Sequence, residues 1–246
     1  REIRPLVGRD LASVALLGLL GYYLSSLLDF KGLEHISAGL ERLILFVYPT
    51  LVALFEAVLF KRRLTRVQLV ALLATYAGIA VVFRSEIGHM GDDVPLGSLL
   101  VFGCSITYAG YLVGSGQLIP RIGSERFTAL ALTVSSLAVL THAAIAGHKL
   151  TGLPAPVYEL GLWLALVATV LPTFLLAEGI RRIGPGPAAI AGTIGPVSTL
   201  ALANIFLGEP VLPLQIFGAV LVLAGATLVA LGRPTSLRPH QTTVTR

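Results

Sequence analysis

Eight long apolar segments constrain this chain more than any other feature of its sequence. They run approximately over residues 11–30, 36–58, 67–83, 96–118, 127–147, 158–177, 185–207 and 212–232. At 1.5 Å per helical residue, each is long enough to cross a hydrocarbon core about 30 Å thick. Backbone amides in lipid must be hydrogen-bonded internally, and no short alternating segments favour a β-barrel. We therefore expect eight transmembrane helices.

The composition agrees with this interpretation. Only 13% of the 246 residues are charged, whereas a typical soluble chain has about 25%. The mean hydropathy is +0.84. The net charge of +5 does not indicate nucleic-acid binding, because the basic residues fall in short loops between apolar runs. We predict an all-α polytopic membrane protein surrounded by the lipid bilayer, and we expect the single cysteine, Cys104, to be a core residue.

The loop charges predict the orientation, because positive residues stay on the cytoplasmic side. When the loops are assigned alternately to two sides, one side receives 14 of the 18 Lys and Arg residues, and Lys31, Arg84 and Lys149 fall on the other. The first group contains Arg1, Arg4, Arg9, Lys61, Arg62, Arg63, Arg66, Arg121, Arg126, Arg181, Arg182, Arg233, Arg238 and Arg246. We therefore expect a multi-pass protein of the cell inner (plasma) membrane with a cytoplasmic, disordered tail at 233–246.

The chain contains an internal repeat. A shift of 147 residues places Gly32 on Gly179 and Pro49 on Pro196, and it brings two pairs of apolar segments into register. Five segments separate equivalent positions. Because five is odd, the two copies cross the membrane in opposite directions, as in many secondary transporters.

The repeat also predicts helices that precede this chain. The second copy begins near residue 96, so the first would begin about 51 residues before Arg1 and would hold two more helices. We expect ten helices in two inverted five-helix repeats, of which this chain carries eight. The expected domains are 1–84 (three helices of the first repeat), 85–95 (a connecting loop), 96–232 (the second repeat) and 233–246 (the tail).

Two blocks of sequence carry a resemblance to a known family. The first covers 32–83 and ends in ALLATYAGIAVVF; the second covers 179–231 and contains LGEP followed by a Gly-rich helix. From residue 1 to about 232 the chain resembles the EamA-type family of the drug/metabolite transporter superfamily, without its first two helices. The resemblance implies two inverted five-helix halves, a central cavity, alternating access, and secondary transport of amino acids, metabolites or drugs.

Glu41 and Arg42 lie inside the segment 36–58. At about 8–9 Å from its outer end, a charge is costly in lipid. Adjacent residues diverge by about 100° around a helix, so we expect each to find a partner elsewhere or to face water. In one hypothesis Glu41 lines the cavity and binds a cationic group or takes up a proton. The alternatives are an interhelical ion pair, or an Arg42 side chain that snorkels to the surface.

Pro49 and Pro196 interrupt two equivalent helices not far from their middles. Proline lacks the N–H that would bond the carbonyl four residues earlier, and its ring kinks the helix. The repeat places both kinks near the midplane, where such transporters bind substrate, and a freed carbonyl is available to a ligand. A kink that serves only packing is the alternative.

Other polar residues inside the segments are weaker candidates. Each needs a partner for its polar group, so some should face the cavity, although most also fit core packing. They are Tyr22, Tyr23, Tyr48, Tyr108, Tyr111, Thr173 and Asn204.

The function predicted from these features is secondary-active transport of a small metabolite, amino acid or drug-like molecule, with export as the expected direction. Two alternatives stay open, a non-transporting scaffold or receptor and a membrane-embedded enzyme. The sequence has no HExxH motif, paired aspartates or P-loop, and His142 lacks a second ligand nearby. We therefore expect no catalytic residues, cofactor or metal. The expected partners are a small-molecule substrate, lipid and a proton or other coupling ion; a homodimer is left open.

Overall fold

A computed structural model describes residues 7–59, 93–148, 150–191, 202–207 and 213–231, together with scattered positions between 61 and 84. Within these residues all regular structure is helical. The first long helix joins α1 (Gly8–Gly18), a π-helical segment η1 (Leu19–Leu24) and α2 (Ser25–Leu33). A second composite helix joins α8 (Ala155–Trp163), the π-helical η2 (Leu164–Val170) and α9 (Leu171–Ile183).

The other elements are single helices. They are α3 (Ala38–Leu45), α4 (Tyr48–Leu59), α6 (Val94–Ile122), α7 (Ser124–Ile145), α10 (Pro185–Ala191), the π-helical η3 (Ala203–Leu207) and α12 (Pro213–Leu231). The described positions from 66 to 84 are also helical.

Five helical stretches of the described residues are long and apolar enough to cross a membrane. They are Gly8–Leu33, Ala38–Leu59, Val94–Ile122, Ser124–Ile145 and Ala155–Ile183. Each matches a segment predicted from sequence to within six residues at either end. The predicted segments 67–83, 185–207 and 212–232 lie partly outside the described residues, and the predicted tail lies wholly outside them. The count of eight helices stays a prediction.

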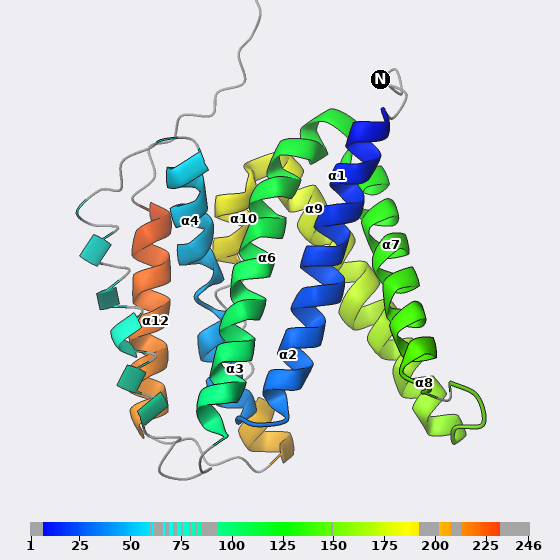
Figure 1. Cartoon of the computed structure of the whole chain (residues 1–246). Coiled ribbons are helices and arrows are strands. Elements are labelled where there is room, and N and C mark those ends of the chain that lie inside the picture. The colour runs from blue at the N-terminus through cyan, green and yellow to red at the C-terminus, as the bar shows by residue number, and fades with distance from the viewer. Residues whose placement is uncertain are drawn as a thin grey trace, which may run out of the picture.

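The helix α6 lies at the centre of the bundle, between α1–α2 on one side and α4 on the other (Figure 1). The chain runs down the view through α1 and α2, up through α3 and α4, and up again through α6. The helix α8–α9 runs opposite to α1–α2. The largest buried cluster gathers on α6, where Tyr111 and Leu112 meet Val14, Val52 and Phe127.

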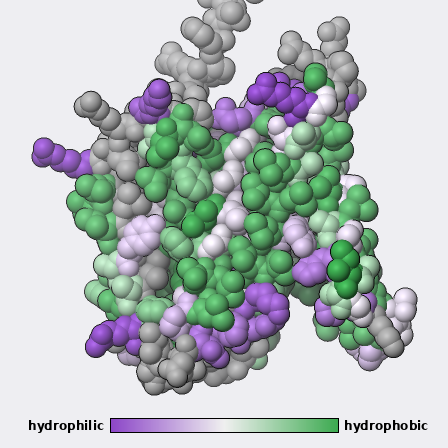
Figure 2. Space-filling model, viewed as in Figure 1, coloured by the Kyte–Doolittle hydropathy of each residue, from purple (hydrophilic) through white to green (hydrophobic). Residues whose placement is uncertain are grey.

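The outer surface suits lipid. Figure 2 shows apolar residues over the middle of this face and hydrophilic residues gathered toward its upper and lower edges. Large apolar side chains such as Leu160, Trp163 and Leu175 are exposed on α8 and α9. In water such a surface would be an aggregation hazard, whereas a bilayer solvates it.

Glycines set the closest helix contacts. A Cβ at Gly18 would lie 2.6 Å from the backbone oxygen of Ala131 on α7, and one at Gly32 would lie 2.9 Å from the oxygen of Gly97 on α6. A backbone atom cannot move aside as a side-chain tip can. These two crossings therefore require glycine, as is common where membrane helices approach closely.

Pro49 interrupts its helix completely instead of only bending it. The helix α3, capped by the hydroxyl of Ser37, ends at Leu45, and α4 begins at Tyr48. The Leu45 carbonyl, which Pro49 cannot bond, lies 3.3 Å from the hydroxyl of Ser105 on α6; the Ile44 carbonyl lies 3.1 Å from the same hydroxyl. The same hydroxyl also lies 3.1 Å from the carbonyl of Val101 on its own helix, so its single hydrogen has three acceptors within reach, of which the Leu45 carbonyl is the farthest.

The packing of α1 on α7 yields a matched test. We expect Gly18→Ala to destabilise the protein by about 1–3 kcal/mol, because the new methyl group meets backbone. Nothing lies within 4 Å of a Cβ at Gly179. Gly179→Ala should therefore be neutral or stabilise by up to about 1 kcal/mol through helix propensity. Thermal unfolding in detergent measures both, and equal effects would contradict the close contact.

Candidate functional site

A cavity of about 490 Å³ lies between η1, α2, α3, α6 and the η2–α9 helix. This volume falls within the usual range of small-molecule sites. Its polar lining consists of Tyr22, Ser25, Ser26, Asp29, Arg42, Tyr48, Tyr108, Thr169 and Thr173. Five of these, Tyr22, Arg42, Tyr48, Tyr108 and Thr173, are candidates from the sequence analysis.

Three charged side chains meet at one end of the cavity. Arg42 lines it, while the neighbouring Glu41 is buried in the wall behind and is only 1% exposed. The Nε atom of Arg42 lies 3.1 Å from Oε2 of Glu41. Glu41 was expected to find a partner elsewhere or to face water, but its cation is the adjacent Arg42, because the long arginine side chain folds back across the helix surface.

The Glu41–Arg42 contact is an ion pair without a well-directed hydrogen bond. Arg42 Nε and Glu41 Oε1 are both buried and have no hydrogen-bond partner. The divergence of adjacent side chains explains this geometry, because the guanidinium reaches the carboxylate at an unfavourable angle. Much of the hydrogen-bonding capacity of the pair is therefore unused.

Asp29 of α2 is the third charged residue, and the sequence analysis did not name it as a site residue. It lines the cavity, its Oδ1 atom is buried without a partner, and its charge acts on Glu41. A signal was present: Tyr22, Ser25, Ser26 and Asp29 follow the spacing i, i+3, i+4 and i+7. They form a polar stripe on one face of an apolar helix, and all four line the cavity.

Tyrosines form a second wall. The rings of Tyr48 and Tyr108 meet edge to face with centroids 5.2 Å apart. The hydroxyls of Tyr22 and Tyr111 lie 2.5 Å apart, and Tyr111 is fully buried behind the lining. The Tyr48 hydroxyl donates to the Ala189 carbonyl at 3.0 Å, which links α4 to α10. The ring faces offer an apolar surface beside the charged end.

Both π-helical segments contribute to the cavity. Gly21 and Tyr22 come from η1, and Ala168 and Thr169 come from η2. Thr173, one turn further along, donates its hydroxyl to the Thr169 carbonyl at 2.6 Å. A π-helical turn widens the helix and redirects its side chains, and such turns are frequent at functional sites.

The remaining candidates lie elsewhere. Tyr23 faces α7, where its hydroxyl lies 3.0 Å from Nδ1 of His142. Pro49 is buried at the helix break and does not line the cavity. Asn204 lies on the exposed η3, and Pro196 lies outside the described residues. Among the described residues, no group of three or more His, Cys, Asp or Glu is placed to hold a metal ion.

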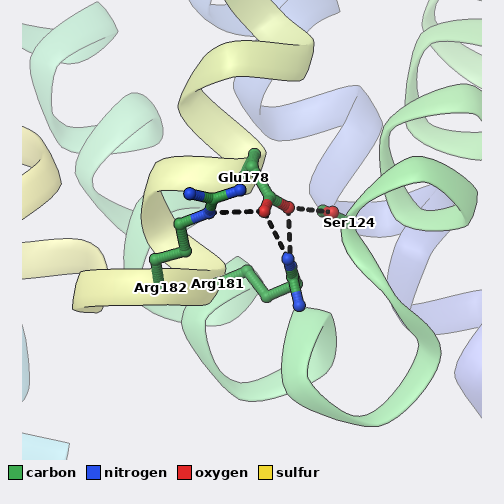
Figure 3. Close-up of polar contacts among 4 residues, drawn as sticks. All are labelled: Ser124, Glu178, Arg181 and Arg182. Carbon is green, nitrogen blue, oxygen red and sulfur yellow. Dashed lines mark hydrogen bonds and ion pairs between the residues drawn. The ribbon is translucent and has the colours of Figure 1, made fainter.

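A separate ionic cluster lies on α9, away from the cavity lining (Figure 3). Glu178 accepts from Nε of Arg181 at 2.6 Å, from Nε of Arg182 at 2.7 Å and from the hydroxyl of Ser124 at 2.8 Å. Ser124 is the first residue of α7, so the cluster ties α7 to α9. Both carboxylate oxygens of Glu178 accept hydrogen bonds, whereas Oε1 of Glu41 has no partner.

The chain matches the model of the EamA-like transporter family over residues 1–84 and 95–231. It is 34% identical over 206 residues to the uncharacterized transporter YcbK of Bacillus subtilis (strain 168), and the match covers 82% of this chain and 66% of that protein. It is 23% identical over 221 residues to a probable terminal-alkyne amino-acid exporter of Streptantibioticus cattleyicolor, covering 90% and 73%.

A solved crystal structure has a similar fold. It aligns with 89% of this chain and 76% of its own chain, with a TM-score of 0.60 and 20% sequence identity. The likeness at this identity concerns the fold.

The ion pair in the cavity wall yields a stability prediction. Arg42→Gln leaves Glu41 without its adjacent cation and should cost on the order of 2 kcal/mol, less than for a fully buried pair, because the Arg42 side chain is 41% exposed. Adding Glu41→Gln should restore most of this loss, since the carboxylate that lost its cation is then replaced by a neutral amide. Thermal unfolding in detergent measures both; a double variant no more stable than the single one would contradict the pairing.

Proposed function

The chain belongs to the EamA-like transporter family, and on that premise we propose that it is a secondary-active carrier that exports a small amphipathic zwitterion by alternating access. The family match and the five long apolar helices of the described residues both indicate a multi-pass membrane transporter. The observation that carries the finer proposal is the cavity itself, which presents Arg42, Asp29 and a wall of tyrosines in one space of about 490 Å³.

The charges of the cavity favour a zwitterion. A guanidinium is suited to a carboxylate, and Arg42 lines the cavity with its side chain 41% exposed. A carboxylate such as that of Asp29 is suited to an ammonium group. The faces of Tyr22, Tyr48 and Tyr108 suit an apolar side chain. An α-amino acid with an apolar side chain combines all three features in one small molecule.

Helix boundaries support an inverted repeat as the basis for alternating access. The helix α1 begins at Gly8 and α8 begins at Ala155, 147 positions later; α3 begins at Ala38 and α10 at Pro185, again 147 positions later. In this pairing α1 and α3 belong to one copy, and α8 and α10 belong to the other. We propose residues 1–84 and 96–232 as the two copies.

The direction of the chain supports the inversion. The composite helices α1–α2 and α8–α9 run oppositely in Figure 1, and each contains a π-helical segment near its middle. Two copies related in this way allow the same site to open to either face of the membrane in turn.

The proposed direction, export, is supported by the Streptantibioticus cattleyicolor relative, which is named a probable terminal-alkyne amino-acid exporter. We propose the plasma membrane as the location, with the tail at 233–246 on the cytoplasmic side, because 14 of the 18 Lys and Arg residues fall on that side. The same charge rule places the outer end of α2 and the beginning of α3 outside.

Counterflow in proteoliposomes tests the substrate class. Vesicles containing the chain are loaded with each of a panel of unlabelled L-amino acids, and entry of the labelled form is measured. We expect saturable exchange of apolar amino acids such as L-leucine. Its analogues 4-methylpentanoate, which lacks the ammonium group, and 3-methylbutylamine, which lacks the carboxylate, should compete about tenfold or more weakly, since each forfeits one charged contact.

Arg42→Gln should weaken competition by L-leucine but leave competition by 3-methylbutylamine unchanged, because the amine has no carboxylate to lose. The control is Glu34→Gln, which removes a charge from an exposed ion pair with Lys31 and should leave competition by both compounds unchanged. Exchange of none of the amino acids, or analogues that compete as well as L-leucine, would contradict the proposal.

A further inference from the structure

Among the described residues, the charges at the end of the cavity do not balance. Asp29 and Glu41 bring two carboxyl groups to one guanidinium, that of Arg42. Glu41 is only 1% exposed, and its Oε1 atom and Oδ1 of Asp29 are both buried without a hydrogen-bond partner. The Glu178 cluster differs, because there two arginines and a serine surround a single carboxylate.

The other described groups around the cluster do not supply the missing positive charge. Cys104 and Tyr108 face it from α6, and Tyr22 and Tyr48 line the same space. Lys31, further along α2, is exposed and is bound to Glu34 at 2.9 Å. The helix α12, which contacts α3, has no ionisable residue over Pro213–Leu231.

An unbalanced negative charge is expensive away from water. Two carboxylates that share one site with too few cations cannot both stay ionised, and the less costly state holds one of them neutral. One bound proton balances this cluster, because one carboxylate is then neutral and the other is paired with Arg42. The unpartnered oxygens of Asp29 and Glu41 are the atoms available to hold that proton.

We propose that Asp29 and Glu41 hold one proton between them in the empty carrier, and that the ammonium group of the substrate displaces this proton when it binds. The second half of this inference rests on the proposed function. In the exchange one carboxyl O–H bond breaks and the proton passes to water in the cavity, while the ammonium donates to the carboxylate left behind. The ammonium takes the place of the proton beside the carboxylates, while the carboxylate of the zwitterion adds one negative charge, which Arg42 faces. The substrate-bound cavity therefore carries one positive charge fewer than the protonated, empty one.

Competition for one site couples two flows in opposite directions. A carrier that must hold either a proton or an ammonium group returns with a proton after it releases its substrate outside. Each ligand lowers the affinity for the other by the same factor. Substrate affinity should therefore fall about tenfold for each unit by which the pH is lowered, in the acid range where the pair is protonated.

Infrared spectroscopy of the purified chain tests the shared proton without any substrate. Near neutral pH, the wild-type chain should show the carbonyl-stretch band of a protonated carboxylic acid, shifted in deuterated water. Asp29→Asn and Glu41→Gln should each lose this band, because either change leaves one carboxylate paired with Arg42 and nothing to protonate. Glu34→Gln, the same chemical change at an exposed residue, should keep it.

The wild-type measurement stands even if a variant fails to fold. Absence of the band from the wild-type chain would overturn the proposal, as would its persistence in both folded variants, which would assign the proton to another group.

Addition of the amino acid that exchanges fastest in the counterflow assay should remove the band, and 4-methylpentanoate should leave it in place. A band unaffected by a transported amino acid would overturn the displacement. A band in a chain that exchanges no amino acid would instead contradict the proposed substrate class and support the shared proton, so the two failures are distinguishable.

Discussion

Among the described residues at the charged end of the cavity, carboxyl groups outnumber cations by one, and the site depends on this constraint. In water, a side chain such as Glu41 would be solvated at little cost, whereas a membrane interior requires a partner for each charge. Here Arg42 reaches one carboxylate oxygen, and the remaining buried oxygens of Asp29 and Glu41 stay unpartnered. A structure that keeps such atoms unsatisfied is prepared to bind something there.

Three helix irregularities bring these polar groups together. The π-helical segments η1 and η2 both line the cavity, and the break before Pro49 separates α3 from α4 beside it. Each irregularity frees backbone groups that lipid could not satisfy. At the break, the hydroxyl of Ser105 lies within hydrogen-bonding distance of the Ile44 and Leu45 carbonyls. The irregular backbone therefore lies where neighbouring helices can cover it.

Sequence alone predicts the five long helices of the described residues well, because apolar length is a property of each segment by itself. They begin and end within six residues of the predicted segments. Tyr48 and Thr173, which the sequence offers as candidates, line the cavity, and their part in transport stays a prediction. Tyr23 shows the limit, since its neighbour Tyr22 lines the cavity while it turns toward His142.

Two features of the site could be recognised only from the three-dimensional structure. Asp29 lies near a helix end and is expected to be interfacial when taken singly, although its stripe with Tyr22 and Ser25 was visible in the spacing. The contact between Glu41 and Arg42 depends on a side-chain conformation that helical geometry disfavours without forbidding. Charge balance, in contrast, can be counted only after the neighbours of each group are known.

The most direct test of the account is the number of protons exchanged for each substrate molecule. In proteoliposomes held at zero membrane potential, an outward substrate gradient is opposed by a graded pH difference until net flux stops. We predict one proton for one substrate, so that about one unit of pH balances a tenfold substrate gradient. Flux that follows the substrate gradient alone, at every pH difference, would contradict it.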